Sequence, residues 1–269
     1  MADASGENPS ADTTHRLYIE YTITWQSPWH VGSGFGSATV DRLVRRRAGA
    51  TGRPFVPGSQ IRGVLRHVCE QLAAALGVPT VPPHALDADS TAQLVRHFGP
   101  LARSELAIDR LFGSRYEGGY LFVSDATPHE HSTSGAPSAL RGPADTEVRM
   151  QTAIDRATGT VLEQRLFSLE LAQPHVNLAG RIRGRHPWAL LTVSDGFPLE
   201  YALLVAALPL IPALGGNKSA GLGRCQIAIE RIEYNGQRRE VKSCLQSFEE
   251  YAQDEDWALW LTMLREQQR

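Results

Sequence analysis

Residues 53–66, RPFVPGSQIRGVLR, place a tight turn directly before a long amphipathic pattern. Pro57 and Gly58 favour the turn, and the hydroxyl of Ser59 suits an N-cap that accepts from a backbone N–H of the first helical turn. Apolar residues then recur at helical spacing, at Ile61, Val64, Leu65, Val68, Leu72, Ala75 and Leu76. The pattern predicts an amphipathic helix over residues 59–76.

Arg62 and Arg66 are four residues apart, so a helix brings them to one face, outside the apolar stripe. Two interpretations stay open. In the first, both arginines are solvated on an ordinary capped helix. In the second, a helix N-terminus preceded by glycine and followed by two arginines binds an anion, most simply a phosphate backbone.

The composition predicts a sizeable core and little overall charge. Of the 269 residues, 42% are hydrophobic, which is enough for a sizeable core. The formal net charge of −2 does not indicate nucleic-acid binding, because nucleic-acid-binding domains are usually basic. The average can hide asymmetry, because arginines cluster in several segments while acidic residues collect at 249–256. A basic surface balanced by an acidic tail is one interpretation, and a general use of arginine in place of lysine is the other.

Cysteine usage and hydropathy exclude several classes of protein. Cys69, Cys225 and Cys244 are scattered, with no CxxC and no histidine at ligand spacing, which argues against a zinc site and against a disulfide framework. No apolar run approaches the ~20 residues that span a membrane, and the N-terminus lacks the apolar segment of a signal peptide. We therefore expect a cytoplasmic protein with no membrane partner.

The first part of the chain predicts alternating strands and helices. Residues 1–16 are small and polar, and we expect them to be disordered. Residues 17–25 alternate among β-formers and predict a strand. Residues 84–112 favour a helical insertion, and residues 119–126 favour another strand. Residues 146–168 predict a β-hairpin, with Gly159 in the turn at 157–160.

The second part completes the pattern. Residues 174–187 are expected to be irregular and basic, although an extended conformation would put three alternate arginines, Arg181, Arg183 and Arg185, on one face. Residues 188–193 predict a buried strand, 198–211 a helix, 225–234 a closing strand and 235–269 a helical tail. Two strand–helix–strand units predict an α+β fold over 17–234, with a ferredoxin-like or RRM-like core.

Two glycine-rich loops stand out from this framework. Residues 30–41, HVGSGFGSATVD, begin at a strand end, where His30 is more often structural than catalytic. Asp41 closes the loop, and from the residues alone it is a turn residue or a partner of Arg42 or Arg45. Residues 214–224, LGGNKSAGLGR, suit a phosphate cradle because glycine-rich backbone N–H groups can converge on an anion.

Together with residues 111–126, LFGSRYEGGYLFVSDA, these segments resemble in type and order the RAMP proteins of CRISPR–Cas systems. The match is best with the repeated backbone subunit of type III effector complexes, which lines the guide RNA. The resemblance runs from about Leu17 to Ile229. The proline-glycine-serine helix start and the late glycine-rich loop carry most of its specificity.

The resemblance implies roles for particular residues. Asp41 would cleave target RNA and hold a divalent metal, Mg²⁺ or Mn²⁺, with phosphate and water completing the coordination. Guide-RNA contacts are implied at His30, Gly58, Ser59, Arg62, Arg66, Gly216, Asn217, Lys218, Ser219 and Arg224. The hairpin would be a thumb that wedges into the guide–target duplex through Arg149, Met150, Ile154 and Arg156, or else a plain solvent-exposed hairpin. Asp125 is a second carboxylate in the pattern, and we favour the role of a strand-end capping residue for it.

The family's function follows as an expectation. The chain would polymerise along the guide RNA, bind target RNA, contact other CRISPR effector subunits and cut the target at regular intervals. One alternative is a capping or scaffold RAMP subunit that binds RNA without cleaving it. Another is a stand-alone, metal-independent endoribonuclease that processes the guide precursor and depends on His30, although no obvious His–Tyr–Lys constellation is present.

Overall fold

The computed structural model describes residues 15–47, 52–75, 107–113, 118–128, 145–186 and 197–246. Three expectations lie wholly or largely outside these segments, namely the helical insertion before residue 107, the strand at 188–193 and most of the C-terminal tail. None of the helices in the described segments combines the length and the apolar character that a membrane crossing requires.

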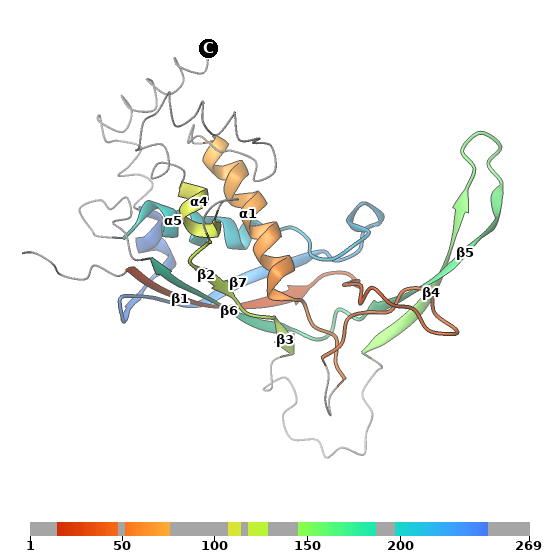
Figure 1. Cartoon of the computed structure of the whole chain (residues 1–269), viewed down its shortest axis with the longest axis horizontal. Helices are drawn as coiled ribbons and strands as arrows, with labels where there is room; N and C mark the ends of the chain where they lie inside the picture. Colours follow the sequence, from red (N-terminus) through yellow and green to blue (C-terminus); the bar gives the residue numbers. More distant parts are fainter. Residues whose placement is uncertain are drawn as a thin grey trace, which may run out of the picture.

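The body is a mostly antiparallel sheet with strand order β2-β6-β1-β7-β8 (Figure 1). Its central strand β1 (His15–Trp25) pairs with β6 (Leu178–His186) on one side and with β7 (Cys225–Tyr234) on the other. The edges hold β2 (Leu121–Val123), β3 (Thr127–Pro128) and β8 (Gln237–Arg239). This order, with helices between β1 and β2 and again between β6 and β7, confirms the predicted ferredoxin-like α+β core.

Burial alternates strictly along β1, so one face of this strand packs against the core. The odd-numbered residues from Leu17 to Trp25 are at most 5% exposed, whereas the even-numbered ones face the other side. The strand begins at His15, so the disorder expected up to residue 16 is wrong for its last two residues. Tyr234 accounts for this, because its hydroxyl lies 2.6 Å from His15 Nδ1 and holds the strand end.

One face of the sheet is covered by α1 (Gly58–Ala75), α4 (Ala107–Phe112) and α5 (Leu199–Ala207), and a 3₁₀ turn, η3 (Leu208–Leu210), follows α5 (Figure 1). In α1 the buried side includes Ile61, Leu65 and Val68, as the spacing predicts, while Ala75 is exposed. Nearly every residue of α5 is buried because the helix packs between the sheet and α1. The three cysteines are buried, and none of them forms a disulfide bond.

The start of α1 differs from its sequence prediction. The helix begins at Gly58, and Ser59 is exposed within its first turn. The cap comes from the carboxylate of Asp125, whose Oδ1 accepts from the Gly58 N–H at 2.9 Å. A Cβ on Gly58 would lie 2.0 Å from the Val123 carbonyl oxygen. The N-cap role predicted for Ser59 is therefore wrong, and Asp125, for which a strand-end capping role was favoured, caps the first turn of this helix instead.

Residues 178–186 are a regular strand rather than the irregular segment expected at 174–187. Pairing with β1 on one side and β2 on the other holds them extended. The alternation predicted for an extended conformation is confirmed, because Arg181, Arg183 and Arg185 are exposed while the residues between them are buried.

The hairpin formed by β4 (Thr146–Ile154) and β5 (Val161–Ala172) projects away from the body (Figure 1). Gly159 has φ of +69° in the connecting turn, so the predicted turn chemistry is confirmed. The last residues of β5 return to the body, where Leu169 and Leu171 are fully buried. We call residues 168–172 the hairpin root.

Candidate nucleic-acid interface

The first glycine-rich loop is fastened along the hairpin root. Trp29 and Ala172 exchange two backbone hydrogen bonds of 2.9 and 2.8 Å, and Arg42 forms a bridge with Leu169. Trp29 is 1% exposed and stacks on Trp25 with ring centroids 4.5 Å apart. The loop therefore runs from the end of β1 to the root of the hairpin, with His30 at one end and Asp41 at the other.

Asp41 is an exposed carboxylate that Ser168 holds in place. Asp41 Oδ2 accepts from the Ser168 N–H at 2.7 Å and from its hydroxyl at 2.9 Å, and the Asp41 N–H donates to that hydroxyl oxygen. The Ser168 backbone and hydroxyl lower the pKa of Asp41, so the group is ionised near neutral pH. Within the described residues Oδ1 accepts no hydrogen bond and no ion pair forms with Arg42 or Arg45.

Glycine keeps this loop compact. A Cβ on Gly36 would lie 2.6 Å from the Asp41 carbonyl oxygen, so a larger residue there would displace Asp41. Nothing in the local sequence points to Ser168 as the partner of Asp41, because the two are 127 positions apart. Sequence reasoning therefore found the carboxylate and missed the serine that orients it.

The donor set around Asp41 limits how a metal could bind. Among the described residues there is no group of three or more His, Cys, Asp or Glu side chains close enough to share an ion. Mg²⁺ in proteins is often held by one or two carboxylates plus substrate phosphates and water. The free Oδ1 of Asp41 fits that pattern, and metal binding here stays a prediction.

His30 connects the two glycine-rich loops. It is 7% exposed; its Nδ1 lies 2.8 Å from the Glu170 carbonyl oxygen, and its own carbonyl accepts from the Gly216 N–H at 2.8 Å. A Cβ on Gly215, whose φ is +100°, would lie 2.5 Å from the His30 carbonyl oxygen. These contacts give His30 a structural role, and a direct contact with RNA stays a prediction.

The second glycine-rich loop presents its polar residues to solvent. Lys218, Ser219 and Arg224 are exposed, and Lys218–Ala220 forms a 3₁₀ turn (η4) that follows Asn217 in the left-handed region. The loop is fixed to the end of β1 because Gly223 N–H donates to Pro28 O at 2.9 Å. The sequence-predicted residues 216–219 therefore lie beside His30, next to the loop that carries Asp41.

The hairpin exposes an unusual number of large apolar side chains. Their exposed fractions are 53% for Val148, 58% for Met150, 61% for Ile154, 58% for Val161, 43% for Leu162 and 61% for Leu166. Arg149 pairs with Glu147 at 2.9 Å, and Arg156 is exposed near the tip. The predicted apolar residues are thus on the surface, where a binding partner can reach them.

Strand register places this apolar surface on the side of Asp41. Met150 pairs directly with Ser168, and Thr152 pairs with Leu166. Side chains of directly opposed residues in an antiparallel pair share a face. The face that carries Met150 and Leu166 is therefore the face on which the Ser168 hydroxyl holds Asp41.

Glu170 fastens the same face to the chain before α1. Its carboxylate accepts from the Val44 N–H at 2.9 Å and pairs with Arg46 at 2.5 Å. Burial raises the pKa of Glu170, but the hydrogen bonds from Val44, Arg46 and Thr146 outweigh burial and hold that pKa below its usual range. No sequence signal singled out Glu170.

Arg62 and Arg66 contact the end of α4. Arg62 donates to the Phe112 carbonyl, and Arg66 donates to the Gly113 carbonyl at 2.8 Å while pairing with Asp109 at 3.0 Å. Both guanidinium groups thus satisfy the C-terminal carbonyls of a helix. The structure gives them a packing role, and their contact with RNA stays a prediction, as it does for Gly58 and Ser59.

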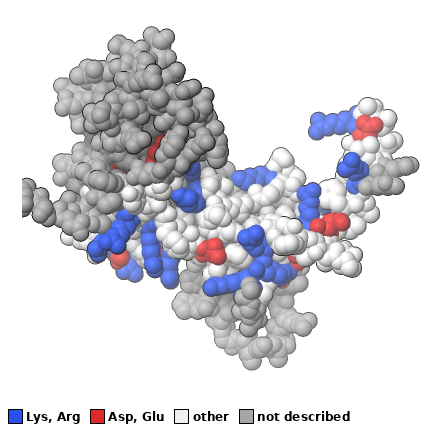
Figure 2. All heavy atoms as spheres, viewed as in Figure 1, with Lys and Arg blue, Asp and Glu red and all other residues white. Residues whose placement is uncertain are grey.

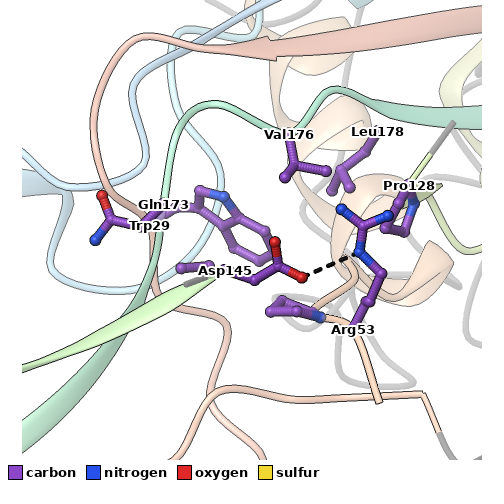
Figure 3. A pocket seen from close by; sticks show the side chains of 9 residues that line it. Trp29, Arg53, Pro128, Asp145, Gln173, Val176 and Leu178 are labelled. Atoms are coloured by element: carbon purple, nitrogen blue, oxygen red, sulfur yellow. Dashed lines mark hydrogen bonds and ion pairs between the residues drawn. The ribbon is translucent and has the colours of Figure 1, made fainter. Parts of the chain in front are cut away.

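A shallow pocket lies where the hairpin joins the sheet (Figure 3). The indole of Trp29 and the side chains of Val176 and Leu178 form its apolar walls, and an Arg53–Asp145 ion pair of 3.1 Å closes one side. Trp29 Nε1 has no hydrogen-bond partner among the described residues. Sequence reasoning did not find this pocket, because its walls come from five separate segments.

A model of the RAMP superfamily matches residues 22–226, about three quarters of the chain. The chain belongs to the RAMP superfamily. The matched range runs from β1 to β7 and includes both glycine-rich loops, α1 and the hairpin. No curated protein gave a match. Membership supports an RNA-binding role in a CRISPR-associated assembly.

Proposed function

We propose that this RAMP protein is a guide-RNA-binding backbone subunit of a type III-like CRISPR effector, which assembles in several copies along the guide and cleaves target RNA at Asp41. One observation carries the proposal: the register pairs Met150 with Ser168, and Ser168 orients the Asp41 carboxylate. The exposed apolar side chain of Met150 and an ionised carboxylate thereby share one face.

The hairpin supplies the wedge. Large apolar side chains that are exposed to water on a projecting hairpin do not contribute to a core. An exposed apolar patch of this kind indicates a binding surface. Met150 and Ile154 are more than half exposed, and insertion between bases would bury them. Separating stacked bases costs a few kcal/mol, which the burial of two such side chains can offset.

Asp41 supplies the chemistry. Ser168 holds one oxygen and leaves Oδ1 open, so the carboxylate is oriented before RNA arrives. A divalent cation, Mg²⁺ or Mn²⁺, would neutralise phosphate charge there. Asp41 would then position the scissile phosphate for in-line attack by the neighbouring 2′-hydroxyl. The 2′-oxygen–phosphorus bond forms as the bond to the 5′-oxygen breaks; the 2′-hydroxyl loses its proton to solvent, the departing 5′-oxygen takes one up, and a 2′,3′-cyclic phosphate remains. Guide phosphates would contact the exposed residues 216–219 and Arg224, and His30 would keep the two loops together.

The decisive experiment is target-RNA cleavage by the guide-loaded complex, comparing wild type with Asp41→Asn. We expect regularly spaced cuts that fall at least about 100-fold in the variant and disappear in chelator. Glu230→Gln, which removes an exposed carboxylate on β7, is the matched control and should cut like wild type. Cuts unaffected by Asp41→Asn would remove Asp41 from the mechanism.

Two other outcomes would select the alternatives. Intact target binding with no cuts in the wild-type complex would indicate a non-cleaving capping or scaffold subunit. Cuts in the guide precursor that persist in chelator and are lost with His30→Ala would indicate a processing endoribonuclease. Polymerisation is tested separately by imaging complexes on guides of two lengths. Head-to-tail assembly predicts more copies on the longer guide.

A further inference from the structure

The face of the sheet opposite the helices bears a concentrated positive charge. We call it the open sheet face, and it consists of the side chains of Arg16, Tyr18, Glu20, Thr22, Thr24, Phe122, Ala179, Arg181, Arg183, Arg185, Ala228, Arg231, Glu233 and Arg238. Figure 2 shows Lys and Arg side chains along the side of the sheet that faces away from the helices. The location is separate from the Asp41 face of the hairpin.

The charge of this face differs in sign from that of the whole chain. It carries six arginines against Glu20 and Glu233, whereas the chain has a net charge of −2. Glu230 is exposed at the β-bulge next to this face. If it is counted with Glu20 and Glu233, the six arginines still exceed the acidic residues by three. Such a surface attracts a polyanion even though the protein as a whole does not.

Three flat groups form a row across three strands of this face, from the edge strand β2 through β6 to the central strand β1. Arg183 pairs in register with Tyr18 on one side and with Phe122 on the other. Its guanidinium carbon lies 5.9 Å from the centre of the Tyr18 ring, and Phe122 is 63% exposed. Aromatic rings and arginine planes at this spacing are the groups on which unpaired bases stack.

Neighbouring contacts hold the row in place. The Tyr18 hydroxyl donates to Glu20 at 2.5 Å, and Glu20 in turn lies 3.5 Å from the Arg181 guanidinium. Glu233, the other acid, is paired with Arg231. Both acids of the open sheet face are therefore engaged by neighbours, which leaves the arginines in excess.

We propose that the open sheet face binds single-stranded nucleic acid, with unpaired bases stacked on Tyr18, Arg183 and Phe122 and with phosphates held by the flanking arginines. A protein partner fits less well, because the rest of the face is small or polar, at Thr22, Thr24, Ala179 and Ala228, and offers no aliphatic cluster to bury. The inference does not depend on cleavage at Asp41.

The test is fluorescence anisotropy of the full chain with a labelled oligouridine of about 12 nucleotides, at several salt concentrations. The double variant Tyr18→Ala and Phe122→Ala should weaken binding about tenfold or more, with the salt dependence unchanged. Tyr18→Phe keeps the ring but removes the hydroxyl that contacts Glu20, and it should lose far less affinity than the double variant. Leu210→Ala removes an exposed apolar side chain elsewhere and is the matched control.

The arginines give an independent signal. Replacing the flanking Arg181 and Arg185 with alanine should flatten the plot of log affinity against log salt by about 1.4, since each lost phosphate contact on a single strand contributes about 0.7. Lys242→Ala, which removes an exposed charge outside the face, should leave the slope unchanged. Unlabelled single-stranded RNA and DNA should both compete, and duplex RNA should compete poorly.

Ultraviolet crosslinking of the wild-type chain should map to Tyr18 and Phe122. Crosslinks confined to the hairpin and the glycine-rich loops, with the ring variant binding like wild type, would overturn the inference. So would a ring variant that loses partner subunits in native mass spectrometry while keeping its RNA affinity, because the face would then be a protein interface. Either result leaves Asp41-dependent cleavage untouched, so the two proposals fail separately.

Discussion

The sheet and the hairpin are both antiparallel β-structure, yet they treat apolar side chains in opposite ways. In β1 every second residue is buried beneath the helices, whereas β4 contains no buried residue at all. An isolated two-stranded hairpin is marginally stable in water, and an exposed apolar face adds to the difficulty. The apolar side chains of the sheet therefore stabilise the fold, whereas those of the hairpin are available to bind a partner.

The change from exposed to buried apolar side chains happens within β5. Leu166 is 61% exposed, while Leu169 and Leu171, a few residues later, are fully buried and pack in a small cluster with Leu222. On the opposite face of the same segment, Ser168 holds Asp41 and Glu170 holds Arg46. The hairpin root thus anchors the binding element and orients the candidate catalytic carboxylate together.

The largest expected effect compares two leucines on this one strand. Leu171→Ala should lower the free energy of unfolding by about 2–5 kcal/mol, because it leaves a cavity in the packed root. Leu166→Ala should change it by less than about 0.5 kcal/mol, because that side chain is exposed. Urea denaturation followed by tryptophan fluorescence measures both. Equal effects would mean that the hairpin is packed as tightly as the root.

The next effect concerns Glu170 and depends on pH. Glu170→Gln should lower the free energy of unfolding by about 1.5–3 kcal/mol at pH 7, since the carboxylate accepts charge-assisted hydrogen bonds. The folded-state pKa of Glu170 lies below its ordinary value of 4.5. The stabilisation is therefore complete above pH 4.5 and is lost as pH falls through the folded-state pKa.

Denaturation from pH 7 to pH 3 checks this prediction. The gap between wild type and Glu170→Gln should narrow toward the acidic end. Glu147→Gln, on the exposed part of the hairpin, removes a carboxylate whose pair with Arg149 is exposed at both ends and should show almost no gap at any pH. A constant gap for Glu170→Gln would contradict a role for its charge.

A smaller effect separates the sequence-predicted helix cap from the observed one. Asp125→Ala should lower the free energy of unfolding by about 0.5–2 kcal/mol, because the Gly58 N–H loses its acceptor. Ser59→Ala should leave it nearly unchanged, and Asp125→Asn should retain most of the stability. Thermal and urea denaturation of the three variants measure the difference. A larger loss of unfolding free energy for Ser59→Ala than for Asp125→Ala would mean that Ser59 is the N-cap after all.

The smallest effect on stability is expected at the hairpin surface. The double variant Met150→Ser and Ile154→Ser should change the free energy of unfolding by less than about 0.5 kcal/mol, because both side chains are exposed. If the hairpin is the proposed wedge, target binding by the guide-loaded complex should fall about tenfold while folding is intact. Unchanged target binding would make it a plain solvent-exposed hairpin.

Local patterns predicted much of this fold because they follow from short-range periodicity. The alternation of β1, the apolar stripe of α1 and the glycine turn at Gly159 were all visible in the sequence. The errors fell where distant segments intervene. Ser59 looks like a cap until Asp125, 66 positions later in the sequence, takes its place, and residues 178–186 look irregular until two neighbouring strands hold them extended.

For the candidate site, the sequence by itself determined which residue types are present: the carboxylate of Asp41, two glycine-rich loops, and a hairpin with apolar side chains. Only the tertiary structure decided how they are used. It paired Asp41 with Ser168, turned Arg66 toward Asp109 and gathered arginines from β1, β6, β7 and β8 on one face. The physical reason is that hydrogen bonds and charge depend on distance in space, which residues far apart in the chain acquire only when the sheet forms.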